Sequence, residues 1–312
     1  MLEERFYSLG RYLKNMFDER VHRISVQLGA APEGEAAVYA LCAGGTIAAP
    51  AAENGSAPVA GQMHNAKERV RQRFKFGKFM VHLHSSAGVL TSMAAIEKAV
   101  DEITLDNEVI GITITVRPEY LTDEMVAFLT KTSRRICTWL EVGLHTVNDE
   151  TLRRIGLNHT GAQAKDSLLR LMNTRAHIAP HVVFGLPGET PEMMRRTIRE
   201  VARLNIEGIN IHNMYVLKNT PLEQEYASGA LKLPERAEYI GLVCDFIEYL
   251  PPSVVLHGLV GTAPEDRLLA PDWTLLRKEN LDMIIAELER RGSVQGCKLT
   301  ELYEVPLPAA NG

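Results

Sequence analysis

The sequence predicts an α/β fold in which parallel strands alternate with helices. Short apolar runs rich in β-formers recur between amphipathic segments of about 10–15 residues, which favours a parallel sheet with right-handed crossovers. One unit is especially clear: a buried run at 181–184 leads through the turn pair Pro187-Gly188 into an amphipathic segment at 190–204. Thr190 can cap that helix, and Pro191 suits its first turn. The sheet is either open or closed into a barrel.

Each element follows from the same patterns. Segment 109–115 is almost continuously apolar and β-branched, as in a strand buried on both faces, and 21–28 alternates. The expected strands are 21–28, 79–84, 109–115, 137–144, 181–184, 206–212 and 254–257. The expected helices are 5–17, 65–74, 91–103, 122–130, 148–155, 162–175, 190–204, 234–249 and 275–291.

Composition limits the class of protein. The 312 residues are 46% hydrophobic and carry a net charge of −5, which describes a globular chain without a general attraction to nucleic acid. No apolar run reaches about 18 residues and the amino terminus is charged, so neither a membrane span nor a signal peptide is expected. Scattered cysteines without a CxxC pair favour a cytoplasmic location. These cysteines are Cys42, Cys137, Cys244 and Cys297.

Domain organisation is expected to be simple, because no convincing break divides residues 1–312. Segment 29–61 is dominated by Ala, Gly and Pro, buries little apolar surface and is expected to form a long loop. Segment 275–312 is expected to form a C-terminal helix and tail.

Several motifs occur in a recognisable order. They are Val-Arg-Pro-Glu at 116–119, Trp-Leu-Glu-Val-Gly-Leu-His-Thr at 139–146, Asp-Glu-Thr-Leu-Arg-Arg-Ile at 149–155, the stretch 181–189, Gly-Ile-Asn-Ile-His at 208–212 and Leu-Ala-Pro-Asp-Trp at 269–273. From about residue 10 to 273, the chain resembles the YhcC-like family of radical S-adenosylmethionine (SAM) proteins, which is related to the elongator catalytic subunit. The resemblance implies a partial (β/α)6 TIM-like barrel with flanking N- and C-terminal helices. Its site is expected at the carboxyl ends of the strands.

The loop after the first strand departs from the family. Radical SAM enzymes hold a [4Fe-4S] cluster there with three cysteine thiolates, and the cluster chelates SAM. In this chain the three positions carry Pro32, Thr46 and Ala49, and Cys42 is the single cysteine of the loop. We therefore expect neither a [4Fe-4S] cluster nor reductive cleavage of SAM.

The resemblance also implies cofactor contacts. Glu141 matches a polar residue that contacts the ribose of SAM, and the glycine turn after the fifth strand matches a segment that flanks the adenine. The alternative for Glu141 is a carboxylate that a neighbouring Arg or His satisfies. The candidate cofactor-binding residues are Glu141, His145, Gly185, Gly188, Glu189 and His212.

Two other sites are considered. Histidines on strands at one end of a barrel would suit a transition metal, with Glu141 as the base of a hydrolase. The metal candidates are His82, His84, His212 and His257. Segment 65–74 is basic, and could contact RNA phosphates or form a solvated helix face. The residues concerned are Lys67, Arg69, Arg71 and Arg73.

The sequence therefore predicts a barrel without a cluster that binds SAM, a nucleotide or RNA without radical chemistry, and leaves open whether the protein is an enzyme. One alternative is an active SAM-dependent radical enzyme, such as a tRNA-modifying one, with unrecognised cluster ligands. The others are a histidine-lined metal hydrolase and a binding partner of tRNA or of an active paralogue.

Overall fold

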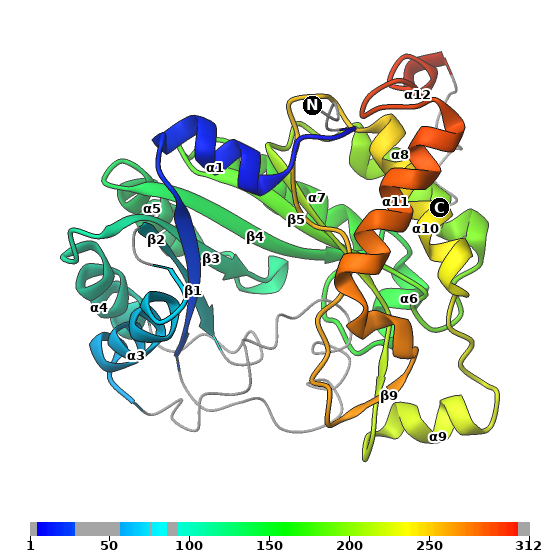
Figure 1. Ribbon diagram of the computed structural model, residues 1–312, viewed down its shortest axis with the longest axis horizontal. Helices are drawn as coiled ribbons and strands as arrows, with labels where there is room; N and C mark the ends of the chain where they lie inside the picture. Colours follow the sequence, from blue (N-terminus) through cyan, green and yellow to red (C-terminus); the bar gives the residue numbers. More distant parts are fainter. Residues whose placement is uncertain (1–4, 29–56, 75–76, 86–92, 305–312) are drawn as a thin grey trace.

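Seven parallel strands form one sheet in the computed structural model, which describes residues 5–28, 57–74, 77–85 and 93–304 (Figure 1). Their spatial order is β1-β2-β3-β4-β5-β6-β8, so the strands follow one another in chain order and only β7 is left out of this sheet among strands β1 to β8 of the described residues. A second sheet pairs β7 with β9 in antiparallel orientation. The strands are β1 (Val21–Leu28), β2 (Lys78–Ser85), β3 (Val109–Val116), β4 (Cys137–His145), β5 (His177–Phe184), β6 (Gly208–Asn213), β7 (Val216–Leu217), β8 (Val255–Gly258) and β9 (Leu268–Ala270).

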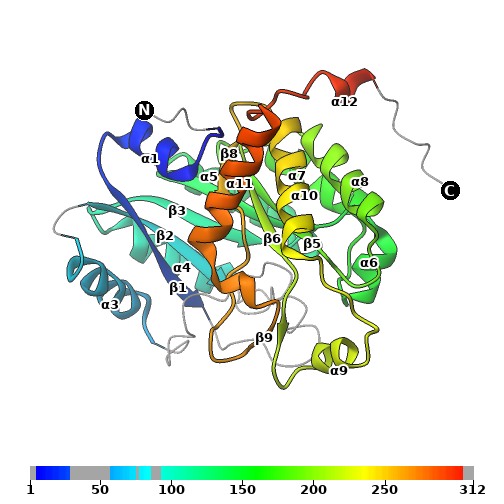
Figure 2. The same ribbon diagram turned by 45° about the vertical axis from the view of Figure 1, so that its right-hand side comes forward.

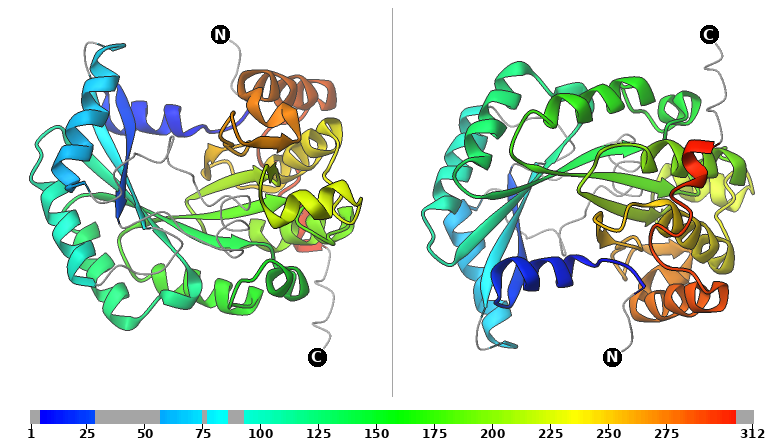
Figure 3. Two further views of the ribbon diagram at one scale, coloured as in Figure 1. Left: turned by 90° about the horizontal axis from the view of Figure 1, so that it is seen from below. Right: turned by 90° about the horizontal axis from the view of Figure 1, so that it is seen from above.

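Helices cover the outer face of the curved sheet, as the two views in Figure 3 show. The result is the partial barrel expected from the sequence. None of the helices in the described ranges is long and apolar enough to cross a membrane. The helices are α1 (Leu9–Phe17), α3 (Val59–Arg71), α4 (Met93–Thr104), η2 (Pro118–Tyr120), α5 (Asp123–Ser133), α6 (Asp149–Arg154), α7 (Gly161–Leu171), α8 (Pro191–Ala202), α9 (Pro221–Ala227), α10 (Arg236–Tyr249), η3 (Asp272–Leu275), α11 (Arg277–Arg291) and α12 (Glu301–Glu304).

The alternation of side chains along each strand separates two environments. On β4, Leu140, Val142 and Leu144 belong to the large core between the sheet and the helices. Trp139 and Glu141 point to the other face, because successive residues of a strand face opposite sides. From Leu140 onward the outer face of β4 is therefore apolar, whereas the inner face changes from apolar at Trp139 to polar at Glu141.

Helix α1 closes the amino-terminal end of the half-barrel. The segment before it runs beside β8, with Leu256 N donating to Tyr7 O at 2.8 Å, and the helix then leads into β1. Tyr12 of α1 packs edge-on against Trp139 at 5.3 Å between ring centroids. The two strands at the ends of the sheet are thus connected by α1, which also fills the inner face at this end (Figure 3).

Several element boundaries differ from expectation. Helix α1 begins at Leu9 rather than at residue 5, and α7 ends at Leu171 rather than at residue 175. Strand β5 starts at His177 rather than 181 and runs through Pro180, which pairs with Val142 where the β4–β5 register shifts; such irregularities tolerate a residue without an N–H. Helix α3 starts at Val59, so the end of the expected loop 29–61 is helical, while its residues 29–56 lie outside the described ranges. The short pair β7–β9 and helix α9 were not expected.

Gly185 ends β5 in a left-handed conformation with φ of 88°. A Cβ at this position would lie 2.4 Å from Pro234 Cδ. We expect Gly185→Ala to lower the free energy of unfolding by about 2–4 kcal/mol, since strain and a steric clash add. Gly229→Ala is the matched control, because Gly229 has φ of 76° but no neighbour within 4 Å of a Cβ. Equal losses in denaturant unfolding of the two variants would show that Pro234 does not matter.

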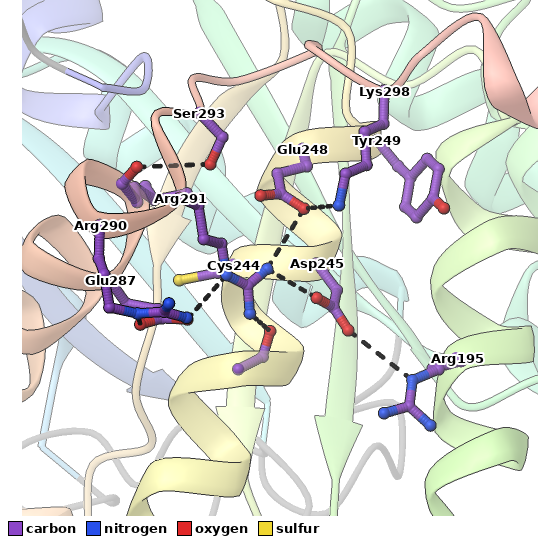
Figure 4. A network of polar contacts seen from close by, with 12 residues as sticks. Arg195, Cys244, Asp245, Glu248, Tyr249, Glu287, Arg290, Arg291, Ser293 and Lys298 are labelled. Carbon is purple, nitrogen blue, oxygen red and sulfur yellow. Dashed lines mark hydrogen bonds and ion pairs between the residues drawn. The ribbon is translucent and has the colours of Figure 1, made fainter.

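Helices α10 and α11 lie side by side (Figure 2) and share an ion-pair network. Figure 4 shows Arg291 of α11 at its centre. Arg291 Nη1 lies 2.8 Å from Asp245 Oδ1 and 3.2 Å from Glu248 Oε2, and Nε lies 2.8 Å from Glu287 Oε1. Lys298 also contacts the buried Glu248 at 2.5 Å. These ion pairs connect α11, through Arg291, and the segment after it, through Lys298, to α10.

Removal of this guanidinium is expected to be costly. Arg291→Met should lower the free energy of unfolding by about 2 kcal/mol, less than for an isolated buried pair because Lys298 still neutralises Glu248. Arg290→Met is the control: Arg290 pairs with the same Glu287 but is exposed, so we expect no measurable change. Thermal unfolding of both variants checks this, and a similar loss in both would contradict it.

Candidate functional site

The polar half of the inner face gathers side chains from six strands around one carboxylate. Inward positions on β1, β2, β4, β5, β6 and β8 place these groups together because the strands are parallel and in register. At the centre is Glu141, whose exposed fraction is 1%. The surrounding residues are Arg23, His82, His84, His181, His212 and His257.

Both oxygens of Glu141 are engaged. Arg23 Nη2 donates to Oε1 at 3.1 Å, and His181 Nε2 donates to Oε2 at 2.9 Å. His82 Nε2 lies 3.2 Å from Oε2 and 3.0 Å from Thr115 Oγ1. His257 Nδ1 lies 3.6 Å from Oε1, too far for a good hydrogen bond. The alternative that a neighbouring Arg or His satisfies Glu141 therefore describes its contacts in this structure.

A further contact connects His181 with His212, near the end of β6. His212 Nε2 lies 2.9 Å from His181 Nδ1, and the two rings stack with centroids 4.9 Å apart and planes at 8°. His212 is 9% exposed, against 4% for His181. Glu141, His181 and His212 thus form a connected line that ends at the carboxyl edge of the sheet.

The remaining histidines pack more tightly. His82 and His84 have ring centroids 3.6 Å apart, and His257 meets Trp139 edge-on at 4.3 Å. The Nε2 atoms of His84 and His257 are buried, and neither has a hydrogen-bond partner among the described residues. Asn210 Nδ2, on β6, is also buried without a hydrogen-bond partner among the described residues.

Burial sets the charges of this cluster. It lowers the pKa of His84 and of His257 to about 4 each, against the opposing effect of Glu141. It lowers the pKa of His212 well below the usual range, and the neighbouring His181 lowers it further. Burial alone would raise the pKa of Glu141, but His82 and His181 lower it well below its usual range. At neutral pH the ionised Glu141 is therefore balanced by Arg23, with His84, His212 and His257 neutral.

His145 ends β4 in an unusual backbone conformation. Its φ is 62°, which a residue with a side chain rarely adopts, and its buried Nδ1 lacks a hydrogen-bond partner in the described part of the chain. Burial lowers the pKa of His145 to about 3, and the nearby His159 contributes. His145 thus combines a strained backbone with a buried ring nitrogen that has no partner among the described residues.

Beside His145 lies a cluster of three charged or titratable residues, Arg117, Glu119 and His159, to which the sequence analysis gave no role. His159 Nδ1 lies 2.9 Å from Glu119 Oε2, and Arg117 pairs with the other carboxylate oxygen. Burial opposes ionisation of Glu119, but the His159 hydrogen bond and Arg117 lower its pKa to about 2. The Arg-Pro-Glu motif could have indicated this ion pair, because it places both charges directly after a strand.

The turn after β5 is hydrogen-bonded to the loop after β4 through Glu189. Glu189 Oε1 accepts from Thr146 Oγ1 at 2.5 Å and from Asn148 Nδ2 at 2.8 Å. Burial raises the pKa of Glu189, and these two hydrogen bonds oppose that effect. Gly188, like Gly185, has a positive φ. Glu189 thus contacts the loop after β4, whereas Glu141 and His212 lie in the inner cluster.

The basic residues of α3 lie elsewhere, on the outer side of β1. Lys67 is buried and pairs with Asp106 and with Glu108 at 2.9 Å. Arg71 also pairs with Glu108, at 2.6 Å. Arg69, Arg71 and Arg73 are exposed, and of these Arg71 is engaged in the ion pair with Glu108.

The described cysteines do not lie at the carboxyl edge. Cys137 begins β4 at the opposite end of the strand, Cys244 is buried in α10 and Cys297 is exposed near α12, whereas Cys42 falls outside the described residues. Across the described ranges, no group of three or more His, Cys, Asp or Glu has a geometry that could hold a metal ion. The metal alternative gains no support from the way His82, His84, His212 and His257 are arranged.

Comparisons with known proteins agree with this architecture. A model of the radical SAM superfamily matches residues 42–201, and a model of the radical SAM C-terminal domain matches residues 206–290. The uncharacterized protein YtqA of Bacillus subtilis (strain 168) is 30% identical over 311 residues, covering 97% of this chain and 95% of YtqA. Protein YhcC of Escherichia coli (strain K12) is 24% identical over 232 residues, 74% of each chain.

Among solved structures, the archaeal Elp3 of Methanocaldococcus infernus with an N-terminal deletion matches with a TM-score of 0.61 at 14% identity. The match covers 89% of this chain and 65% of that one. At this identity the likeness shows a shared fold.

Proposed function

Because the chain belongs to the radical SAM superfamily, we propose that its half-barrel binds a small molecule of the SAM or nucleotide class without carrying out radical chemistry. The observation that carries the proposal is the polar inner face around Glu141, which contains buried ring nitrogens without partners in the described chain. Buried polar groups are nearly always hydrogen-bonded, so these nitrogens favour a polar ligand.

The lack of radical chemistry is inferred from the donor set. A [4Fe-4S] cluster of the superfamily needs three thiolates. Between β1 and β2 the sequence contains one cysteine, Cys42, and the others lie at the amino end of β4, in α10 and near α12. The residues present therefore do not fit a three-cysteine cluster, and the proposed function does not depend on one.

The charge of the site supports a ligand with neutral polar groups. Arg23 and Glu141 neutralise each other, and burial keeps His84, His145 and His257 uncharged at neutral pH. Ribose hydroxyls and base edges are neutral hydrogen-bonding groups that suit such surroundings. In this proposal Gly185 and Gly188 flank the base, and His145, Glu189 and His212 border the carboxyl edge.

The test is anaerobic iron–sulfur reconstitution, followed by iron and sulfide analysis and by calorimetric titration of the same sample with SAM and with adenosine. We expect no stoichiometric cluster and measurable binding of at least one of the two compounds. Near-stoichiometric incorporation of about four irons and four sulfides, the content of a [4Fe-4S] cluster, would contradict the proposal.

The main alternative is an active SAM-dependent radical enzyme, such as a tRNA-modifying one, with ligands other than three cysteines. The same reconstitution separates it from the proposal, because it requires iron together with bound SAM. If neither iron nor either compound binds, a scaffold for tRNA or for a paralogous partner becomes the better explanation. Arg69 on α3 and Arg73, two residues after its end, are then the first residues to replace in an RNA-binding assay.

A further inference from the structure

The line from Glu141 through His181 to His212 fixes the positions of hydrogens as well as of rings. An ionised carboxylate can only accept hydrogen bonds, so His181 Nε2, which lies 2.9 Å from Glu141 Oε2, must carry a proton. Glu141 already has a cationic partner in Arg23, and a second cation on His181 would be a buried charge without its own counter-ion. A singly protonated His181 therefore carries its proton on Nε2 and has a lone pair on Nδ1.

The same reasoning extends to the next ring. His181 Nδ1 accepts, so His212 Nε2, 2.9 Å away, donates to it. A neutral His212 then carries its lone pair on Nδ1. Its pKa is lowered well below the usual range by burial and by His181, which agrees with a neutral ring at physiological pH. The hydrogen-bond polarity of His212 is thus determined by a carboxylate two residues away in the network.

We propose that Glu141 and His181 are positioning residues that hold His212 as a hydrogen-bond acceptor at the carboxyl edge, where its Nδ1 accepts from a hydroxyl or amino group of the bound molecule. His212 lies one residue before the end of β6 and is the most exposed of the three. His145, at the end of β4, has a buried Nδ1 without a partner among the described residues. The identity of the ligand group rests on the proposed function, whereas the relay itself does not.

This inference changes the role of Glu141. The family resemblance implies direct contact between this carboxylate and a ribose. In the structure both of its oxygens are taken up by Arg23 and His181, with His82 close by, so its influence reaches a ligand through the imidazoles. A ligand that offers only acceptor groups to His212 would be disfavoured, because two lone pairs would face each other.

The relay is tested on the complete protein labelled with ¹⁵N-histidine. Two-bond ¹⁵N–¹H correlation spectra at neutral pH report which ring nitrogen of each histidine carries the proton. We expect His181 and His212 both in the neutral Nε2–H form. A proton on His212 Nδ1, or a cationic His181, would overturn the proposal without requiring any variant or ligand.

The ligand contact is tested by replacing His212. In His212→Gln the side-chain amide can still donate to His181 from the Nε2 position but has no acceptor at the Nδ1 position. We expect about tenfold weaker binding of SAM or adenosine, the loss of one hydrogen bond, with little change in the melting temperature. His177→Gln is the control, because His177 lies on β5 at the amino end and should leave binding unchanged.

The outcomes are distinguishable. Unchanged affinity in His212→Gln, measured against a wild-type protein that binds, overturns the ligand contact. Absence of binding in the wild type contradicts the proposed function and with it the ligand group named here, while the spectra still decide the relay.

Discussion

Replacement of Glu141 by alanine is expected to lower the free energy of unfolding by about 2 kcal/mol, because it removes the acceptor of the buried His181, while the remaining cation, Arg23, is partly exposed to solvent. The change leaves Arg23 without its counter-ion and deprives His181 of its acceptor. It also removes the negative charge that favours protonation of His84 and His257, so their pKa values should fall further. Denaturant unfolding with urea measures the loss.

A double replacement separates the missing charge from the missing volume. In Arg23→Met with Glu141→Leu both charges disappear and apolar side chains fill similar space, so much of the stability should return. The single variants Arg23→Met and Glu141→Leu complete the cycle. A loss of less than about 0.5 kcal/mol in Glu141→Ala, below the usual cost of leaving a buried hydrogen-bonding group without its partner, would mean that the carboxylate is not an essential part of the inner face.

Acidification should destabilise the protein well above the pH at which its carboxylates are protonated. The folded-state pKa is about 4 for His84 and His257 and about 3 for His145, because burial disfavours the cation. In the unfolded chain a histidine has a pKa of about 6.5, so the unfolded state binds more protons between these values. Stability from these groups is complete above about pH 6.5 and declines as the pH falls toward about 4.

The size of this effect follows from the same values. At a pH of about 5, each of the three histidines should contribute a loss of about 2 kcal/mol. Since the rings interact, we expect a combined loss of about 4–6 kcal/mol relative to pH 7. The measurement is the unfolding free energy as a function of pH. His84→Gln should reduce its slope, whereas His64→Gln, on the exposed face of α3, should not. A flat profile between about pH 7 and 5 would show that the histidines are not held neutral by burial.

The alternation of strands and helices could be predicted from the sequence because each strand carries a local signal. Strand β1 has the expected limits, and Thr190 caps α8 by accepting from Met193 N. Errors arose where tertiary context decides: β5 continues through Pro180 because the neighbouring register is irregular, and α3 starts before its basic residues. The β7–β9 pair joins strands of two and three residues that are far apart in the chain, which no local pattern reveals.

The site was harder to predict than the fold. That Glu141 and several histidines share the inner face follows from their positions on strands. Which of them contact each other depends on the register between strands, and that is a property of the folded sheet. Arg23 illustrates the limit: a cation on an alternating strand reads as a solvent-facing residue, yet it is the counter-ion of the buried carboxylate. Lys67 is the opposite case. It was considered as a phosphate contact or as part of a solvated helix face, yet it is buried in an ion pair.

Helix α1 closes one end of the half-barrel, so the inner face is not open at both ends. Leu9, Tyr12 and Leu13 pack with Trp139 and its apolar neighbours, so the amino-terminal end of the inner face is filled with side chains. The end of the inner face that α1 covers is therefore not an approach to the Glu141 cluster. Arg23, on the edge strand β1, keeps 31% of its side chain exposed while it pairs with Glu141, so the cluster is in contact with solvent along that edge of the sheet.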